Sequence, residues 1–362
     1  MITFDNVTKA YPDGTVAVDG LNLEAADGEL TVLVGPSGCG KTTSLRMINR
    51  LIEPTSGSIL LGNERTGDMD PALLRRRIGY VIQNAGLFPH RTIAENVATM
   101  PILLGEKRRT ALIQAEELLE RVGLPRTFAK RYPWQLSGGQ QQRVGVARAL
   151  ASSPRYMLMD EPFSAVDPIV RAQLQDEFLR LQADIGKTII MVTHDIDEAL
   201  KLGDKVAVMR VGGKVAQLAT PAELLANPAD SFVADFLGRD RGYRFLGFVG
   251  VDGRVELTDE PVAVLGEPVP AHLGAEPWVL VLDTAQRPVG WVEPSTTDGP
   301  IREEHLNLSG THARHDETMR QILDSALSSP SRRGVVVDGL GTFKGTVTAS
   351  TVVAALEGVK VS

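Results

Sequence analysis

The sequence is poor in cysteine, since its 362 residues contain only Cys39. A single cysteine cannot form an internal disulfide, so a reducing compartment is the expected setting. Long apolar runs are also missing: no stretch approaches the roughly 18 apolar residues that a membrane-spanning helix needs. Residues 1–14 are charged early and have no apolar core, which predicts that no signal peptide opens the chain. If the protein works at a membrane, we expect another chain to span it.

Positive charge is not in excess either. The chain has 38 Lys and Arg against 45 Asp and Glu, a net charge of −7. This balance argues against a nucleic-acid carrier, so we expect no nucleic-acid partner. With 43% hydrophobic and 23% charged residues, the composition is that of an ordinary globular protein, and the length fits two domains.

The clearest motif is GPSGCGKT at residues 35–42, which matches the phosphate-loop pattern G-x-x-x-x-G-K-[ST]. The apolar run Leu30–Val34 before it predicts a buried strand, and apolar residues at helical spacing from Leu45 to Ile52 predict a helix after it. A chance match is the alternative, and this flanking context argues against it. Loop N–H groups and the Lys41 ammonium suit phosphate oxygens, and the Thr42 hydroxyl suits Mg²⁺. The residues predicted to bind ATP here are Ser37, Gly38, Cys39, Gly40, Lys41, Thr42 and Thr43.

Polar residues follow two further predicted strands. Asp160 and Glu161 come directly after the apolar run 156–159, and His194 follows the run 188–193. In an open parallel sheet, ligands gather at the carboxyl ends of the strands. We therefore predict that Asp160 binds Mg²⁺, that Glu161 orients or deprotonates an attacking water, and that His194 contacts the γ-phosphate. Taken alone, each could be a solvated acid or a structural histidine at a strand end.

The stretch LSGGQ at residues 136–140 predicts a helix N-terminus. Ser137 is a good N-cap residue, and the two glycines after it remove side chains from the first turn. An open helix N-terminus is an anion site. The segment itself supplies no anion for this site, so we expect the anion to come from a binding partner.

Residues 1–237 resemble the nucleotide-binding subunit of an ATP-binding cassette (ABC) transporter. GPSGCGKT resembles its Walker A loop, LSGGQ its signature and YMLMDEP its Walker B strand, while VIQNAGLF, SAVD and VTHD resemble its Q-loop, D-loop and switch. The resemblance implies a P-loop α/β fold, with a RecA-like core plus antiparallel β and helical subdomains. It also implies that Tyr11 stacks on adenine beside Val16, and that Gln83 is both a metal ligand and a catalytic residue, together with Lys41, Glu161 and His194.

The same resemblance implies partners. Two such chains, here expected to be a homodimer, face each other head to tail, so that Ser137, Gly139, Gln140 and Asp167 contact the nucleotide held by the other chain. Integral-membrane permease subunits and a substrate-binding protein complete the transporter. The chain would then lie at the cytoplasmic face of the cell membrane.

Residues 238–362 lack any phosphate loop. They contain a sequence pattern twice: an apolar run is followed by Asp, a turn and Gly, and then by a second apolar run. They resemble a tandem pair of cystathionine-β-synthase-type (CBS) modules, an α+β domain. In this family such a tail is typical of importers for osmoprotectants such as glycine betaine, proline betaine, choline and carnitine. Thr351 stands where the ribose-binding Asp belongs, so adenosine binding by the usual contacts is not expected. Arg332, Arg333 and Lys344 are either a solvated face or a site that responds to salt or an anion.

Three alternatives accompany this interpretation. The same ATPase could serve another polar solute or amino acid, or the chain could be a non-transport ABC ATPase. The second lacks support, because neither long coiled coils nor a second cassette occurs in this sequence. A regulatory protein with an inactive cassette would require loss of Lys41, Glu161 or His194, and all three are present.

Overall fold

The computed structural model describes residues 1–83, 85–164, 166–251 and 253–356. Two compact units emerge, Met1–Leu237 and the part from Gly238 onward, called here the N-terminal and C-terminal units. The described residues leave out one position in the predicted Q-loop segment and one in the predicted D-loop segment. They also leave out the last residues of the predicted 238–362 domain.

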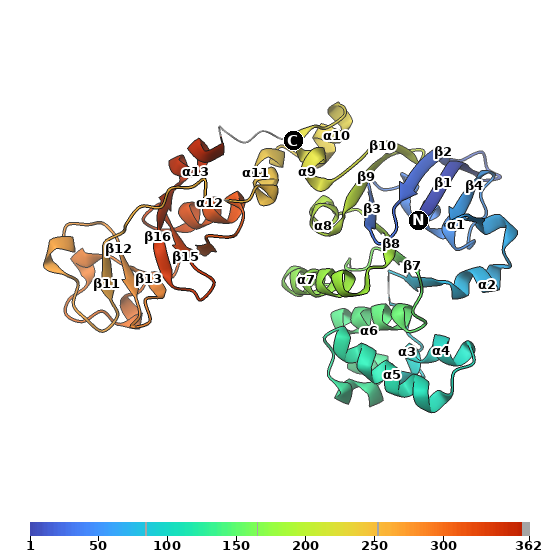
Figure 1. Ribbon diagram of the computed structural model, residues 1–362, viewed down its shortest axis with the longest axis horizontal. Coiled ribbons are helices and arrows are strands. Elements are labelled where there is room, and N and C mark those ends of the chain that lie inside the picture. Colours follow the sequence, from blue (N-terminus) through green and yellow to red (C-terminus); the bar gives the residue numbers. More distant parts are fainter. Residues whose placement is uncertain (84, 165, 252, 357–362) are drawn as a thin grey trace. The chain divides into compact units, whose positions relative to one another are not determined.

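The central sheet of the N-terminal unit runs in the order β10-β9-β3-β8-β7-β6 (Figure 1). Its strands are parallel apart from β10, which pairs antiparallel with β9. Every residue of β3, β7 and β8 is buried, as expected for parallel strands covered on both faces. The carboxyl ends of β3, β6, β7 and β8 therefore meet at one edge. The strands are β3 (Leu30–Val34), β6 (Ile78–Val81), β7 (Tyr156–Asp160), β8 (Thr188–Thr193), β9 (Lys205–Arg210) and β10 (Lys214–Ala219).

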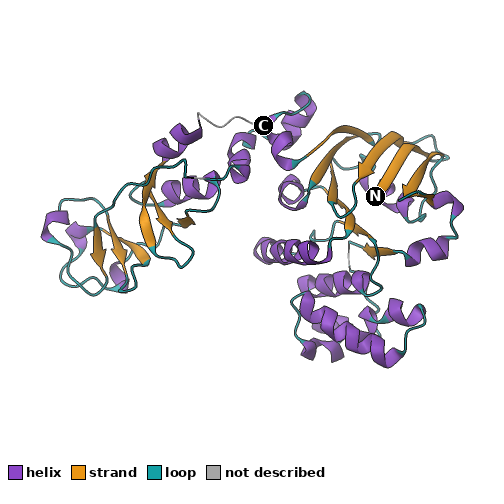
Figure 2. Ribbon diagram, viewed as in Figure 1, coloured by secondary structure: helices purple, strands orange, loops and turns teal. Residues whose placement is uncertain are grey.

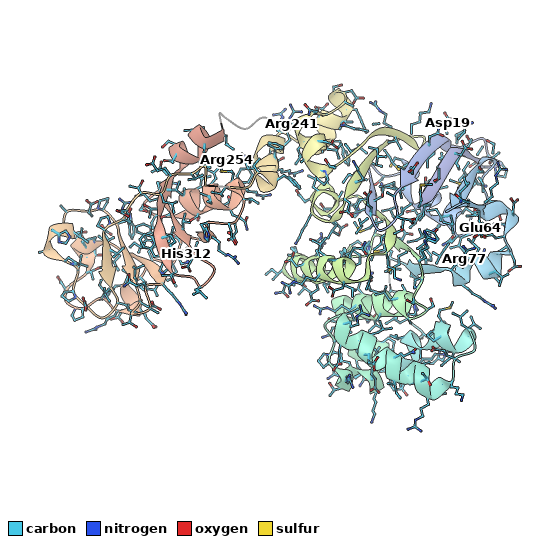
Figure 3. The ribbon with its side chains drawn as sticks, in the orientation of Figure 1. Asp19, Glu64, Arg77, Arg241, Arg254 and His312 are labelled. Carbon is cyan, nitrogen blue, oxygen red and sulfur yellow. The ribbon has the colours of Figure 1, made fainter. Side chains whose placement is uncertain are left out.

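An antiparallel sheet packs onto this core in the order β2-β1-β4-β5. Phe4 and Leu21 from this sheet share one buried cluster with Leu33 and Leu158 from the central sheet. Figure 3 labels Glu64 and Arg77, whose two-point ion pair at 2.9 and 3.0 Å joins β5 to the end of helix α2. Both side chains are exposed, so the pair contributes little to stability. The elements are β1 (Ile2–Ala10), β2 (Val16–Ala25), β4 (Ser56–Leu61), β5 (Glu64–Arg65) and α2 (Pro71–Arg76).

Helix α1 (Lys41–Ile48) follows the phosphate loop and packs against β7 and β8. The sequence pattern predicted a helix as far as Ile52, and this is wrong. The helix ends at Ile48 because Arg50 adopts a left-handed φ of 54°, which turns the chain out of the helix. Leu51 is consequently half exposed.

Four helices form the helical part of the N-terminal unit (Figure 1). Apolar residues at helical spacing from Ile93 to Met100 favour one continuous helix, but Ala98 separates two short helices there. Residues Ala111, Ala115 and Leu119 form the buried face of the longer helix that follows. The helices are α3 (Ile93–Val97), α4 (Thr99–Leu103), α5 (Arg108–Arg121) and α6 (Gly138–Leu150).

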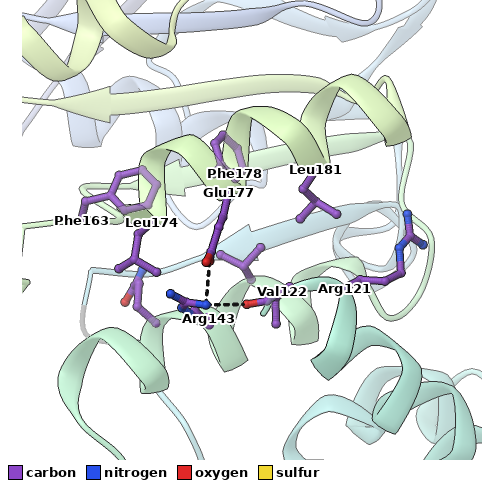
Figure 4. A pocket seen from close by; sticks show the side chains of 10 residues that line it. Arg121, Val122, Arg143, Phe163, Leu174, Glu177, Phe178 and Leu181 are labelled. Carbon is purple, nitrogen blue, oxygen red and sulfur yellow. Dashed lines mark hydrogen bonds and ion pairs between the residues drawn. The ribbon is translucent and has the colours of Figure 1, made fainter. Parts of the chain in front are cut away.

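Helix α7 (Pro168–Ile185) connects this helical part to the core. Arg143 of α6 forms an ion pair with Glu177 of α7 at 2.6 Å and donates to the Val122 carbonyl, and Leu174 and Phe178 line the groove beside them (Figure 4). On its other side α7 bonds to α8 (Ile196–Leu202). The unit ends with α9 (Pro221–Ala226) and α10 (Ser231–Leu237), and its 3₁₀ turns cover Thr66–Asp68, Arg126–Lys130 and Pro133–Gln135.

The C-terminal unit repeats one pairing pattern, in which a short strand runs parallel to a second and the second pairs antiparallel with a third. Figure 2 shows these two groups of strands in orange. The second repeat carries helices after its first and third strands, whereas the first has only the 3₁₀ turns Ala271–Leu273 and Pro294–Thr296 there. The elements are α11 (Arg241–Phe245), β11 (Val262–Val264), β12 (Val279–Leu282), β13 (Pro288–Val292), β14 (His312–Arg314), α12 (Met319–Ser328), β15 (Arg333–Val337), β16 (Phe343–Thr348) and α13 (Ala349–Leu356), with further 3₁₀ turns at Leu246–Phe248 and Glu303–His305.

The two repeats share a buried core, in which Leu280 and Trp291 of the first meet Val335 of the second. A buried ion pair lies between them, since Arg333 Nη2 is 2.9 Å from a carboxylate oxygen of Glu260, a side chain only 3% exposed. Lys344 in turn pairs with Asp338 at 3.2 Å. Arg333 is therefore held in an ion pair and the solvated-face alternative is wrong for it, whereas a response to salt or an anion stays a prediction.

Candidate nucleotide-binding site

The phosphate loop connects β3 to α1 and depends on glycine for its shape. Gly38 and Gly40 have left-handed φ values of 79° and 91°. A Cβ on Gly40 would lie 2.4 Å from the Ala17 carbonyl oxygen, so no side chain fits there. Gly40 is also the N-cap residue of α1 and provides no side-chain cap. The first N–H groups of α1 are thereby left available to an anion.

Lys41 lies in the wall of this loop. It is 7% exposed, and its ammonium donates to the carbonyl oxygens of Gly35 at 2.7 Å and Pro36 at 3.0 Å. A cavity of about 280 Å³ opens beside it, close to the lower end of typical ligand pockets, about 300 Å³. The cavity is lined by Ala17, Ser37, Gly38, Cys39, Gly40, Lys41, Thr42, Thr43, Glu161 and His194. All seven predicted phosphate-loop residues thus line one cavity, together with two of the predicted catalytic residues.

Asp160 ends β7 beneath the loop and is 4% exposed. The Thr42 hydroxyl donates to Asp160 Oδ1 at 3.1 Å. A hydroxyl and a carboxylate in contact are oxygen donors of the kind that Mg²⁺ selects, so these two residues fit the predicted metal. Sequence reasoning missed two further contacts to Asp160 Oδ2, from Arg46 Nη2 at 3.4 Å and the Tyr80 hydroxyl at 3.5 Å. Burial raises the pKa of Tyr80, which keeps this hydroxyl protonated as a donor.

Glu161 joins three strand ends. Its carboxylate is 3.2 Å from His194 Nδ1, which follows β8, and accepts a hydrogen bond of 3.1 Å from the Gln83 amide, which follows β6. Glu161 has a φ of 46°, an uncommon value for a residue with a side chain. Its N–H donates to Val192 and its carbonyl accepts from the Ser164 hydroxyl, and these bonds hold the strained backbone. The structure therefore brings together the predicted trio of Glu161, His194 and Gln83.

Tyr11 directly follows β1, and Val16 is the first residue of β2. Both side chains are exposed, and the Lys9 ammonium lies 5.2 Å from the centre of the Tyr11 ring. Neither residue lines the cavity, whereas Ala17 next to Val16 does. The assignment of these two residues to adenine remains a prediction.

The signature segment forms a separate part of the chain. Ser137 caps α6 as predicted: its hydroxyl accepts from the Gln140 N–H at 3.3 Å, and the Gln140 side chain accepts in return from the Ser137 N–H at 3.0 Å. Gly138 is exposed, but Gly139 is buried and a Cβ there would lie 3.3 Å from Val170 of α7. The expectation that both glycines open the helix terminus is therefore wrong for Gly139, which is small because α6 packs closely on α7.

Asp167 is also used locally, as the N-cap of α7 that accepts from the Val170 N–H at 3.1 Å. Neither Asp167 nor Ser137, Gly139 or Gln140 lines the cavity at the phosphate loop. The phosphate-loop cavity and the signature segment are therefore separate parts of this unit. Fold and site together define a P-loop cassette for a nucleoside triphosphate.

Comparison with known proteins specifies the class. Residues 18–164 match the family model described as ABC transporter. The chain is 44% identical to the osmoprotectant import ATP-binding protein OsmV of Salmonella typhimurium, over 96% of this chain and 94% of that protein. It is 54% identical to the carnitine transport ATP-binding protein OpuCA of Listeria monocytogenes, over 67% of this chain and 60% of that protein. It is 52% identical to the choline transport ATP-binding protein OpuBA of Bacillus subtilis, over 67% and 63%.

A solved structure is similar as well. The dimeric, post-hydrolysis ATP-binding cassette MJ0796 bound to ADP and Pi superimposes with a TM-score of 0.56 at 35% identity, over 61% of this chain and 99% of that one. The chain belongs to the ABC transporter family, among its ATP-binding proteins, and it is an ATPase. Among the described residues, no helix has the length and apolar character required to cross a bilayer.

Proposed function

We propose that this chain is the ATPase subunit of an importer for small quaternary-amine osmoprotectants such as glycine betaine, carnitine or choline. It would act at the cytoplasmic face of the membrane, on permease subunits that receive solute from a substrate-binding protein. The observation that carries the proposal is the convergence of Lys41, Asp160, Glu161 and His194 on one site, in a chain similar to OsmV along nearly its whole length.

The chain's own residues divide the chemistry. Lys41 and the loop N–H groups bind the triphosphate, and Mg²⁺ held by Thr42, Asp160 and the Gln83 amide oxygen would supply charge neutralisation at the β- and γ-phosphates. Glu161 orients the attacking water and accepts its proton. His194, whose Nδ1 lies 3.2 Å from the Glu161 carboxylate, contacts the γ-phosphate. Positioning and electrostatics account for the catalysis.

The signature half-site completes the active site of a second copy. The capped N-terminus of α6, with Ser137 and Gln140 at its start, is an anion site that lies apart from the cavity of its own chain. In a head-to-tail pair it would hold the γ-phosphate bound to the partner, with Gly139 and Asp167 shaping the contact. The dimeric state of the similar cassette MJ0796 supports this arrangement.

For the C-terminal unit we propose a CBS-type pair with a regulatory role. Its support is the repeated strand pattern and the shared core between the repeats. The Thr348 hydroxyl accepts from the Thr351 N–H at 3.2 Å and lies 2.9 Å from the Thr351 hydroxyl. Because Thr351 is committed to this helix start, ribose recognition by the usual contact is not expected.

The test is uptake of labelled glycine betaine, choline and a control sugar, in cells with and without the gene, at low and high external salt. The deletion strain complemented with the Glu161→Gln chain serves as the matched control, because it keeps the subunit and removes turnover. We expect betaine or choline uptake to fall on deletion, to stay low with the variant, and to differ most at high salt. Unchanged uptake of both amines would contradict the cargo, and absence of the chain from the membrane fraction would favour a non-transport ATPase.

A further inference from the structure

Helix α8 begins two residues after His194 and carries a buried carboxyl group, Glu198. The side chain is 5% exposed, and the chemistry proposed above gives it no task. A buried carboxyl group is costly unless it makes compensating contacts. Its partners therefore indicate what it does.

The first partner is Gln175 of α7. The Gln175 amide donates to Glu198 Oε1 at 3.3 Å, and Gln175 is itself only 7% exposed. The bond is thus shielded from water and ties the first turn of α8 to the middle of α7. Polar bonds in such surroundings are more rigid and more costly to break than exposed ones.

Thr193, the last residue of β8, lies near this carboxyl group. Its hydroxyl accepts from the Asp195 N–H at 3.1 Å, a bond that spans His194. Burial raises the pKa of Glu198, and the neighbouring Thr193 and Gln175 side chains lower it. The charged neighbours act in opposite directions, with Asp195 raising the pKa and Arg171 of α7 lowering it.

The turn that carries His194 is consequently fixed from several sides. Asp195 caps α8 by accepting from the N–H groups of Asp197 at 2.9 Å and Glu198 at 3.2 Å. Arg171 approaches the other oxygen of Asp195 at 3.5 Å. Within this network, Glu198 supplies the buried link between the turn and α7.

We propose that Glu198 is a positioning residue: its carboxyl group is held by Gln175 of α7 and its N–H by Asp195, so that it fixes the turn from β8 to α8 and keeps the His194 imidazole against Glu161. The proposal rests on the ATPase function proposed above. The same helix α7 also contacts the signature helix α6 through Arg143 and Glu177. Glu198 therefore ties the switch turn to α7, a helix that also contacts the signature helix.

A matched control lies on the same two helices. Lys201 of α8 forms an ion pair with Asp176 of α7 at 2.7 Å, and these side chains are 35% and 55% exposed. Removing it breaks an exposed α7–α8 link and leaves the buried one intact. Lys201→Ala should accordingly keep ATP turnover within about twofold of the parent protein, as expected for surface ion pairs.

The experiment measures kcat and KM for Mg-ATP, and the thermal unfolding midpoint, in the full chain. For Glu198→Ala we expect kcat to fall about ten- to a hundredfold, a range typical of a displaced catalytic group, with KM unchanged because the phosphate loop is untouched. Glu198→Gln should stay within about twofold of the parent, since the carboxamide has the same shape and its oxygen can still accept the hydrogen bond from Gln175. Gln175→Ala breaks the same bond from the other side and should also lower kcat.

A double variant separates positioning from mere stability. If Glu198 acts through His194, Glu198→Ala should cause no further loss of kcat when His194→Ala is already present. Additive losses would overturn the proposal, as would a folded Glu198→Ala protein with the parent kcat. If Glu198→Ala does not fold, a normal kcat in folded Gln175→Ala overturns it equally. Absence of ATP turnover in the parent protein would instead contradict the proposed function.

Discussion

The two units use their charged side chains in different ways. In the N-terminal unit, Lys41, Asp160, Glu161 and His194 come from separate strand ends and meet at one site. In the C-terminal unit, Glu260 forms an ion pair with Arg333, and Asp338 forms an ion pair with Lys344. The difference shows that the candidate nucleotide-binding groups lie in the first unit, whereas these charged groups of the second unit form ion pairs within its fold.

The largest expected effect comes from Glu161→Gln. The amide cannot accept a proton from water, so ATP turnover should fall by about a hundredfold or more. ATP binding should persist, because the phosphate loop and Asp160 are unchanged. Phosphate release and equilibrium binding of labelled ATP measure the two quantities. A variant that turns over ATP at the parent rate would remove Glu161 from the mechanism.

The signature half-site is tested by a pair of helix caps. Ser137→Ala and Thr220→Ala each remove a hydroxyl that caps a helix through a capping box, at α6 and α9. Each should cost about 1 kcal/mol of stability. Only Ser137→Ala should also lower ATP turnover, by about tenfold, because a hydrogen bond to a charged phosphate is lost as well. If the two variants turn over ATP at the same rate, Ser137 acts only as a structural cap of α6.

The structural use of charge in the C-terminal unit is tested by Glu260→Ala. Removing this carboxylate leaves Arg333 without its partner at the contact between the repeats, and should lower the free energy of unfolding of this unit by about 2 kcal/mol. Urea unfolding measures the loss, with Arg302→Ala, from an exposed pair, as the control expected to change little. Intrinsic ATP turnover should be unaffected. Loss of turnover would show that the two units are not separable in this way.

The smallest effect concerns Asp338, at the turn between β15 and β16. Hydrogen bonds from the N–H groups of Thr342 and Leu340, and the nearby Lys344, lower its pKa to about 2 from the usual 3.8. Because the folded-state pKa is depressed, the stabilisation is present above pH 3.8 and is lost as the pH falls through about 2. NMR titration of the Asp338 carboxyl group checks this, and an ordinary pKa would contradict the turn geometry.

Much of the first unit was predictable because its signals are local. The strand, glycine loop and helix around Lys41 occupy consecutive residues, and parallel strands place Asp160 and His194 at one edge. The roles of Arg46 and Tyr80 were not predicted, because their contacts with Asp160 depend on how α1 and β6 pack against β7. The burial of Gly139 against Val170 is a tertiary property of the same kind.

The second unit was less predictable. Its strands and the amphipathic helix α12 follow from apolar patterns. The ion pair of Arg333 with Glu260 joins residues far apart in sequence, so no local sequence pattern predicts it. In the first repeat, the two apolar runs on either side of Asp283 predicted strands, and β12 and β13 confirm them. The 3₁₀ turns that stand where the second repeat has helices had no such pattern.

The most direct test of the central claim is the mass of the full-length Glu161→Gln chain in solution, with and without Mg-ATP, measured by sedimentation. Two half-sites on one chain predict a single-chain particle without nucleotide and a two-chain particle with Mg-ATP. Adding Ser137→Ala to this variant should weaken the ATP-dependent pair. A single-chain particle at saturating ATP would contradict the account, because the signature half-site would then have no nucleotide to complete.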